Sequence, residues 1–539
     1  MVDMQHFSTL GHWRPAAQPV FDPNTLTTLV YRFREQMMVL THPEVSAIGV
    51  AIGEGQWGTM GEGYPVVAIL PPMYPEWLGS RTFTERHDCR FPYVSGAMAN
   101  GIATTDLVEA IVHMGGMGFF GAAGLSVEQV SSALDRLQTV LPGSVSWGSN
   151  LIHSPNEPQL EAAIAELYLK RGVRRVSAAA YMKLSPYILR YALAGLRVNA
   201  HTGQIDRQNH VFAKVSRPEV AAHFMSPAPK PMVDDLLSKG WITTEEAHLA
   251  QYVSVAEDII VESDSGGHTD NQAISALFPS IVQLRNDIVR RHSLTRAIHL
   301  GAAGGLGDPQ GVAAAFAMGA DFVLTGSVNQ GCIESGLDAS GKALLAQVQL
   351  GDVTMAPAAD MFELGVEVQV LKRGSLFAQR AHKLYTLYRQ YESLWDIPST
   401  DRKTVEQSIL RSTLEEAWAN TEAYWNGRDT NEVRKALQNP KHQMALVFRS
   451  YLGLSSRWAI QGSDERKLDY QIWCGPAMAA FNTWAKGSFL EKPEQRRAAQ
   501  VGRNLLEGAC QILRAQQLRA AGVSVPSEAF VTQPQFWSE

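Results

Sequence analysis

Short apolar runs alternate with amphipathic helical patterns from residue 92 to residue 327. This alternation indicates parallel β/α winding, because a strand followed by a crossover helix pairs in parallel with the next strand. Eight such runs are more than an ordinary doubly wound sheet contains, and the span is close to the ~250 residues of a closed barrel. We therefore predict an α/β fold, a (β/α)8 TIM barrel. The expected strands are 92–98, 117–123, 145–152, 174–180, 210–216, 258–263, 296–304 and 321–327, and the expected helices are 106–114, 127–137, 159–171, 186–193, 274–290 and 309–318.

The segments on either side of this alternation differ from it in texture. In the N-terminal segment, helical spacing over 26–40 gives way to β-rich pieces, whereas the segment beyond about 355 is mainly helical and rich in tryptophan. Two insertions interrupt the barrel, near 195–209 and 218–250, and insertions after barrel strands commonly form lids over the active face. The predicted domains are an α+β region at 1–85, the barrel at 86–365 and a helical domain at 366–539.

Composition excludes several classes of protein. The chain has 539 residues and a net charge of −6, whereas a general nucleic-acid binder usually carries a basic surplus. The four cysteines lie far apart without a CxxC pair, so we expect no zinc or other metal site and no disulfide framework. No apolar run reaches the ~18 residues of a membrane helix, and the N-terminus does not resemble a signal peptide. We expect a soluble, cytoplasmic protein without membrane insertion, and the sequence leaves a homo-oligomer open.

Polar and small residues occur where the expected strands end, and barrel enzymes place their functional groups at these ends. The first strand ends in a ledge of small residues, against which a flat ring fits. The third strand ends at Asn150, whose carboxamide can both donate and accept hydrogen bonds. The fifth strand ends near Lys214, a cation that a barrel would partly bury. The alternatives, a loop-capping Asn150 and a surface Lys214, stay open at this point. The ledge residues are Ala97, Met98 and Ala99.

The sixth strand leads into Gly266, Gly267 and His268. Paired glycines let the backbone approach a ligand closely and adopt positive φ. A histidine beside them can move a proton near neutral pH. We predict a cofactor-binding role for both glycines and a catalytic role for His268; the alternative is a structural histidine.

The last two strands also end in small residues. Backbone amides from these two strand ends, with a short helix N-terminus, form the usual phosphate site of such barrels. Together with the ledge, the carboxamide and the cation, this arrangement suggests bound FMN. There is no Walker A motif, and no GxGxxG opens a helix after a first strand, so a separate dinucleotide-binding domain is not expected. The predicted phosphate-binding residues are Gly304, Gly305, Thr325, Gly326 and Ser327.

Two further features invite a functional interpretation. Cys332 follows the eighth strand, but no helper base lies nearby in sequence, so a nucleophilic role is disfavoured. A basic run interleaved with aromatic residues could bind an acidic protein, although a solvated helix face explains it equally well. The basic residues of this run are Lys372, Arg373, Arg380, Lys383 and Arg389.

Several segments between about residue 60 and residue 490 are similar to known flavin enzymes. As a group they resemble the nitronate monooxygenase-like flavin barrels, and more specifically the PfaD family of trans-acting enoyl reductase subunits. Nitronate monooxygenases usually carry Glu-Ala-Gly-Gly-His where this chain has Asp264-Ser265-Gly266-Gly267-His268, which moves the prediction away from nitroalkane oxidation. The segments are YPEWLGSRTF (74–83), FPYVSGAMANGIA (91–103), WGSNLIHSP (147–155), SDSGGHTDN (263–271), LTGSVNQ (324–330), APAADMFE (356–363), QVLKRGSLF (369–377) and DYQIWCGPAM (469–478).

The resemblance implies reduction of a trans-2-enoyl thioester carried on an acyl carrier protein of a fatty acid or polyketide synthase. NADPH would supply the hydride through FMN, and the α-carbon would then need a proton. His268 is the expected proton donor, or the group that orients the thioester carbonyl, and Lys214 would stabilise negative charge on the reduced cofactor. The alternatives are a nitronate monooxygenase-type oxidase and a flavin-retaining docking subunit of a megasynthase.

Overall fold

The computed structural model describes residues 9–154 and 157–538. At its centre lies a closed barrel of eight parallel strands, in which strands that follow one another in sequence are also neighbours. This confirms the predicted (β/α)8 fold. The barrel strands are β6 (Tyr93–Ser95), β7 (Met117–Phe120), β8 (Trp147–Ile152), β9 (Arg175–Ala179), β12 (His210–Val215), β13 (Asp258–Glu262), β14 (His299–Ala303) and β15 (Phe322–Thr325).

The interior of the barrel is a packed apolar core rather than a channel. Phe119, Phe212 and Phe322 meet there, and α2 (Arg81–His87) closes the amino-terminal end of the barrel with Phe83, which stacks on Phe322 at 4.3 Å between ring centroids. Among the described residues the amino-terminal end is closed, so a ligand is expected at the carboxyl-terminal end. The helices around the barrel are α3 (Thr105–Met114), α4 (Val127–Val140), α5 (Pro158–Arg171), α6 (Pro186–Leu193), α7 (Pro218–Met225), α10 (Ile274–His292) and α11 (Pro309–Ala317).

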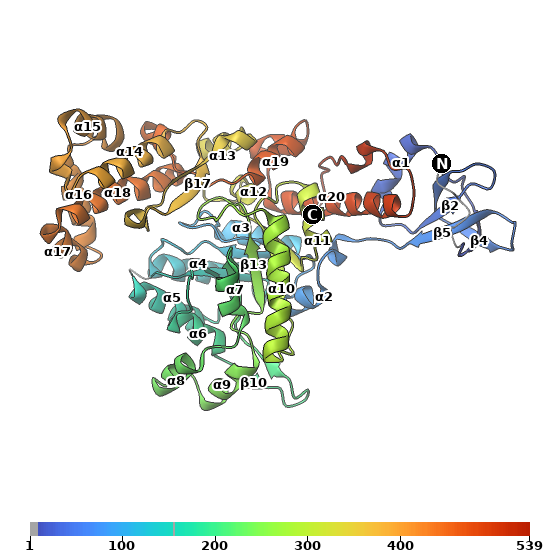
Figure 1. Ribbon diagram of the computed structural model, residues 1–539, viewed down its shortest axis with the longest axis horizontal. Helices are drawn as coiled ribbons and strands as arrows, with labels where there is room; N and C mark the ends of the chain where they lie inside the picture. Colours follow the sequence, from blue (N-terminus) through green and yellow to red (C-terminus); the bar gives the residue numbers. More distant parts are fainter. Residues whose placement is uncertain (1–8, 155–156, 539) are drawn as a thin grey trace.

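The two insertions lie at the amino-terminal end of the barrel, so the expectation that they form lids over the active face is wrong. The hairpin lies between α6 and β12, and the extra helices lead into β13, so both join strands where the strands begin. They also contact each other, because the Gly195 N–H donates to Glu246 Oε1 at 2.6 Å. Figure 1 shows them at the bottom, opposite the C-terminal helices. The insertions contain β10 (Arg197–Val198), β11 (Ile205–Asp206), α8 (Lys230–Ser238) and α9 (Thr244–Leu249).

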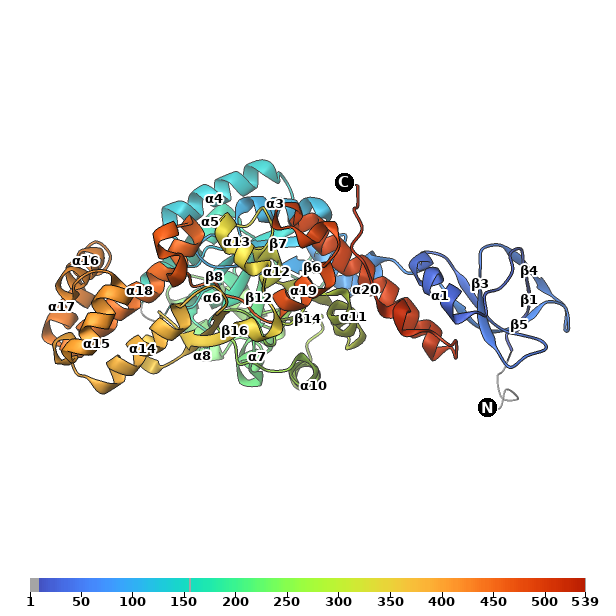
Figure 2. The same cartoon turned by 90° about the horizontal axis from the view of Figure 1, so that it is seen from above.

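The N-terminal segment forms a five-stranded antiparallel sheet that extends from the barrel (Figure 2). The helical spacing over 26–40 predicted a helix that is too long. The helix α1 (Pro23–Leu29) ends early, and Met37–Thr41 is a strand whose alternate residues Met37 and Val39 pack against α1 and α20 (Ala498–Ala520). Alternating burial on the two faces of a sheet therefore overrides the local helical pattern. The strands are β1 (Gly11–Pro15), β2 (Met37–Thr41), β3 (Ile48–Ile52), β4 (Gly55–Gly58) and β5 (Tyr64–Leu70).

The C-terminal half contributes to two separate apolar cores. Residues from 356 to 452 share a core of their own, whereas α19 and α20 pack into the core that surrounds the barrel. The single helical domain at 366–539 stays a prediction. The two cores indicate that its last two α-helices, α19 and α20, pack with the barrel. None of the helices in the described residues is long and apolar enough to span a membrane. In chain order, the elements are α13 (Ala339–Leu345), the hairpin of β16 (Val353–Pro357) and β17 (Glu367–Leu371), α14 (Phe377–Gln390), α15 (Ser399–Thr404), α16 (Leu414–Asn426), α17 (Thr430–Gln438), α18 (Pro440–Gln461), α19 (Ala477–Ala485) and α20 (Ala498–Ala520).

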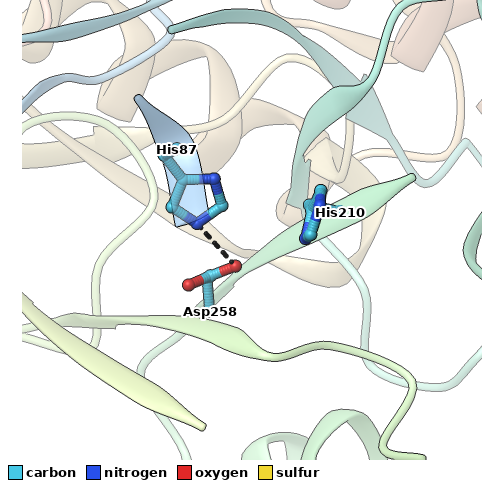
Figure 3. Close-up of side chains that lie close together, drawn as sticks. All are labelled: His87, His210 and Asp258. Carbon is cyan, nitrogen blue, oxygen red and sulfur yellow. Dashed lines mark ion pairs between the residues drawn. The ribbon is translucent and has the colours of Figure 1, made fainter. Parts of the chain in front are cut away.

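A cluster of ionisable side chains is buried at the closed end of the barrel (Figure 3). Asp258 is fully buried, and its two carboxylate oxygens lie 2.9 Å from His299 Nδ1 and 3.2 Å from His87 Nε2. Burial alone would raise the pKa of Asp258, but the charge and hydrogen bond of His87 and the hydrogen bond of His299 hold it well below its usual range. The other charged residues of this cluster are Arg86, Arg175, Arg207, Glu257 and Arg296.

Three members of this cluster, His87, His210 and Asp258, offer ligand atoms within 4.8 Å of one another, as a metal site would. However, Arg175 Nε donates a hydrogen bond to His87 Nδ1 at 3.1 Å. Because Nδ1 accepts this bond, the proton of a neutral imidazole resides on Nε2, which faces Asp258 Oδ2. A metal ligand needs an unprotonated nitrogen at that point. We therefore interpret the group as a hydrogen-bonded charge cluster.

From this cluster we predict that the free energy of unfolding decreases as the pH is lowered. Burial lowers the pKa of His87 and of His210, while the unfolded chain takes up protons near pH ~6.5. Below that pH the unfolded state binds more protons than the folded state, so the free energy of unfolding decreases by ~1.4 kcal/mol per pH unit for each imidazole. The pKa of Glu257 is about 2, because Arg207 and Arg296 outweigh its desolvation. This carboxylate therefore also makes the free energy of unfolding decrease as the pH falls below ~4.

The measurement is urea unfolding at pH 7, 6 and 5 for the wild type, His210→Gln and His201→Gln. We expect His210→Gln to make the free energy of unfolding depend less steeply on pH, by about the contribution of one imidazole. The exposed His201 serves as the control and should leave it unchanged. A slope that is the same in all three proteins would show that His210 is protonated equally in the folded and unfolded states.

Candidate functional site at the carboxyl end of the barrel

The glycine pair after β13 is required by two neighbouring segments of backbone. Gly267 has φ +85°, and it exchanges backbone hydrogen bonds of 2.9 and 2.7 Å with Gln369 in β17. A Cβ on Gly266 would lie 2.7 Å from the Cys474 backbone nitrogen, and one on Gly475 would lie 2.8 Å from the Gly266 nitrogen. The motifs at 369–377 and 469–478 therefore hold the turn that carries the histidine. The predicted ligand contacts of both glycines stay a prediction.

His268 projects from this turn at the open end of the barrel. Its side chain is 44% exposed, and its Nε2 lies 3.3 Å from Oδ1 of Asp360. Asp360 belongs to the connection between β16 and β17, so the same hairpin that holds the turn also supplies the carboxylate. An imidazole beside a carboxylate and open to solvent is suited to holding and delivering a proton.

Lys214 also lies at the open end of the barrel, where its ammonium group forms an ion pair with a carboxylate. Its Nζ lies 3.0 Å from Oε1 of Glu262, the last residue of the neighbouring strand β13. The Lys214 side chain is 31% exposed and that of Glu262 is 14% exposed. The two side chains form an ion pair between the neighbouring strands β12 and β13. The sequence pattern predicted the lysine but not its partner.

Asn150 holds the neighbouring loop in place. Its Oδ1 accepts a hydrogen bond from the Ala123 N–H at 2.9 Å, and the Ala123 carbonyl accepts one from the Asn100 N–H at 2.7 Å. The carboxamide is buried, and it joins strand β8 to the loops after β7 and β6. This contact supports the structural alternative for Oδ1. The ledge residues Ala97, Met98 and Ala99 lie half-buried in the first of these loops.

The ends of β14 and β15 leave space where a phosphate would fit. A Cβ on Gly305, which has φ +69°, or on Gly326 would meet no atom within 4 Å. The adjacent Ser265 Oγ is buried and has no hydrogen-bond partner among the described residues. Open space beside main-chain amides, together with a free hydroxyl, is the kind of concavity that binds an anion. Ser327, the first residue of α12 (Ser327–Gln330), accepts a hydrogen bond from Gly475 N at 3.2 Å.

Two of the predicted phosphate ligands have structural partners instead of open space. A Cβ on Gly304 would lie 2.6 Å from Ser263 Oγ, so this glycine is required by the end of β13. Thr325 is buried, and its hydroxyl lies 2.6 Å from Tyr93 Oη and 2.9 Å from Asn329 Nδ2. Only the main chain of these two residues is therefore suited to contact a ligand.

A second histidine on this face was missed. His153 follows β8, and its Nδ1 lies 2.8 Å from Oε2 of Glu161, whose side chain is 1% exposed. Glu161 also accepts hydrogen bonds from the hydroxyls of Tyr181 and Ser185. The signal was the histidine in the WGSNLIHSP segment, but its carboxylate partner lies on the next helix and could not be assigned.

The two other features that invited a functional interpretation have plain structural explanations. Cys332 is fully buried, and desolvation raises the pKa of its thiol far above the usual range, which disfavours a nucleophilic thiolate. In the basic run, Arg373, Arg380 and Lys383 form ion pairs with Asp352, Asp469 and Asp401 respectively. Three of the five basic residues are thus engaged in ion pairs within the chain, and the choice between a solvated helix face and a docking surface stays open.

Comparison with known proteins places the chain among enzymes of lipid and polyketide synthesis. It is 43% identical over 476 residues to a polyunsaturated fatty acid synthase subunit of Thraustochytrium sp., covering 86% of this chain and 32% of that protein. It is 40% identical over 454 residues to the polyketide biosynthesis protein ThaF of Burkholderia thailandensis, covering 84% of this chain and 39% of ThaF. The chain thus spans only about a third of the length of these curated relatives.

The fold and one segment have further matches. The crystal structure of the enoyl reductase domain of MlnA from Bacillus amyloliquefaciens is 35% identical, with a TM-score of 0.79. The match covers 83% of this chain and 99% of that domain. Residues 391–470 match the family described as acyl-carrier-protein S-malonyltransferase, inserted helical domain.

Proposed function

We propose that this chain, which belongs to the PfaD-like family of polyunsaturated fatty acid and polyketide synthase proteins, is a trans-acting enoyl reductase. Its substrate is a trans-2-enoyl thioester on an acyl carrier protein, and its reductant is NADPH. The observation that carries the proposal is the match to almost the whole length of a solved enoyl reductase domain. The site at the open end of the same barrel is consistent with it.

FMN is the cofactor that the site fits best. The space beside Gly305 and Gly326, with the free hydroxyl of Ser265, suits the phosphate of the cofactor, and the ledge at 97–99 suits its ring. Hydride transfer from NADPH to the β-carbon of the substrate is the chemistry that bound FMN supplies. The protein residues contribute binding, orientation and proton handling.

Two side chains have assigned roles in the proposal. With FMN bound, Lys214, held by Glu262, would stabilise negative charge on the reduced cofactor. His268, beside Asp360, delivers the proton to the α-carbon or orients the thioester carbonyl. Lys214 lies near the end of β12, and His268 lies in the turn after the neighbouring strand β13, so both belong to the carboxyl-terminal end of the barrel.

The carrier protein partner is inferred from the similar proteins. Two of them are a fatty acid synthase subunit and a polyketide biosynthesis protein, and the 391–470 segment matches a domain of an acyl-carrier-protein malonyltransferase. An acidic carrier protein then needs a cationic contact near the open end of the barrel. The paired residues of α14 do not offer one.

The test is NADPH oxidation by the purified protein loaded with FMN. We expect absorbance at 340 nm to fall only when a trans-2-enoyl thioester is added, with one saturated thioester formed per NADPH. Oxygen uptake with a nitroalkane in the absence of NADPH would instead identify a nitronate monooxygenase. Bound flavin and carrier protein binding without turnover of either substrate would identify a docking subunit.

A further inference from the structure

A cleft separates α18 from the loops that follow β6 and β7. Its volume is about 290 Å³, near the lower end of the range for small-molecule sites. The helix supplies one wall and the barrel loops the other. The lining is mixed, with three carboxamides, one cation and two apolar side chains: Asn100, Gln129, Gln461, Arg457, Leu125 and Ile460.

Arg457 is the cation in this cleft. Its side chain is exposed, and it makes no ion pair or side-chain hydrogen bond with any residue of 9–154 or 157–538. The basic residues Arg373, Arg380 and Lys383 near α14 each have a carboxylate partner. Arg457 can therefore pair with an incoming anion without losing an existing partner, which makes binding of the anion more favourable.

One wall of the cleft belongs to the loop that carries the predicted ring ledge. Asn100 in the cleft wall follows Ala99, and its N–H donates to the Ala123 carbonyl at 2.7 Å. Ala123 is in turn held by Asn150. The carboxamide of Asn100 in the cleft wall is therefore one residue away from the ledge along the chain.

We propose that this cleft receives the phosphopantetheine arm of the carrier-bound substrate. The arm carries a phosphodiester at its protein end, amide groups along its length and the thioester at its tip. Arg457 pairs with the phosphodiester, the carboxamides of the cleft pair with the amides, and the thioester lies over the ledge. This inference rests on the proposed function, because it names the docking route of that substrate.

The experiment compares Arg457→Glu with Arg434→Glu, an equal charge change at an exposed residue of α17 on the same helical unit. We expect Arg457→Glu to raise KM for an enoyl-acyl carrier protein and for a free enoyl-4′-phosphopantetheine. The increase should be about tenfold larger than for the N-acetylcysteamine thioester, which lacks the phosphate. Arg434→Glu should change none of these values.

A binding measurement keeps the inference testable apart from turnover. Calorimetry with 4′-phosphopantetheine and FMN-free protein should give about tenfold weaker binding for Arg457→Glu than for the wild type. Equal affinities, or an equal rise in KM for all three thioesters, would overturn the inference. So would a rise in KM for NADPH alone, because the anion would then be the dinucleotide phosphate. If the wild type reduced no enoyl thioester, the proposed function would fail, and calorimetry would still decide whether the cleft binds the arm.

Discussion

Replacing His268 with alanine is expected to lower kcat for enoyl reduction by ~100–10,000-fold, the contribution of a positioned acid. The residue is 44% exposed and its side chain pairs with Asp360, which is also exposed, so its loss should leave the barrel intact. The flavin should remain bound, because the predicted phosphate site lies on β14 and β15 and not on the histidine. The measurements are the bound-flavin absorbance and NADPH oxidation with an enoyl thioester.

A matched control for this variant is His113→Ala, an exposed histidine in the last turn of α3. It should have wild-type rates. Near-normal turnover of His268→Ala would remove that residue from the chemistry. His153, held by the buried Glu161, would then be the histidine on the same face to replace next. Loss of flavin together with activity would instead indicate that His268 supports the cofactor site.

Replacing Asp258 with asparagine is expected to lower the free energy of unfolding by ~3–5 kcal/mol. The amide is isosteric but neutral, so the variant removes the buried negative charge that faces Arg86 and the imidazoles of His87 and His299. The cost is large because Asp258 is fully buried and its partners cannot turn to solvent. Thermal and urea unfolding of the two proteins at pH 7 measure it directly.

The control for this prediction is Asp234→Asn, which removes an exposed ion pair with Lys230. Such surface pairs contribute ~0–1 kcal/mol, so this variant should unfold almost as the wild type does. A similarly small effect for Asp258→Asn would show that water or structural relaxation compensates the cluster. Because the cluster lies at the closed end of the barrel, we expect kcat at a permissive temperature to change little in comparison with His268→Ala.

The outcome at individual residues shows where sequence patterns are informative. The strand that ends near Lys214 was predicted because the run His210–Val215 is mostly apolar, and the turn that carries His268 was predicted because Gly266 and Gly267 follow an apolar run. Glu262 and Asp360, which contact these two residues, were not predicted. Glu262 lies on a neighbouring strand, and Asp360 lies in a hairpin about ninety residues further along the chain. Local periodicity contains no information about such contacts.

The insertions illustrate the same limit in the fold. Their boundaries were visible as extra segments at 195–209 and 218–250, but their position at the closed end depends on which strand ends they connect. In the N-terminal sheet, the residues after Leu29 leave the helical pattern because Met37 and Val39 pair in a strand and pack on α20, more than 450 residues away. Tertiary burial outweighed a weak local preference there.

The sequence by itself determined the eight-fold alternation, the closed barrel that it folds into and the strand ends at which glycines and polar residues gather. These features follow from short-range periodicity and backbone stereochemistry, which each segment expresses on its own. Only the tertiary structure decided the ionic partners, the buried charge cluster that closes the barrel and the cleft between α18 and the barrel loops. Those features arise where distant segments meet, because the energy of a charge or a polar group depends on burial and on neighbours that the folded chain brings together.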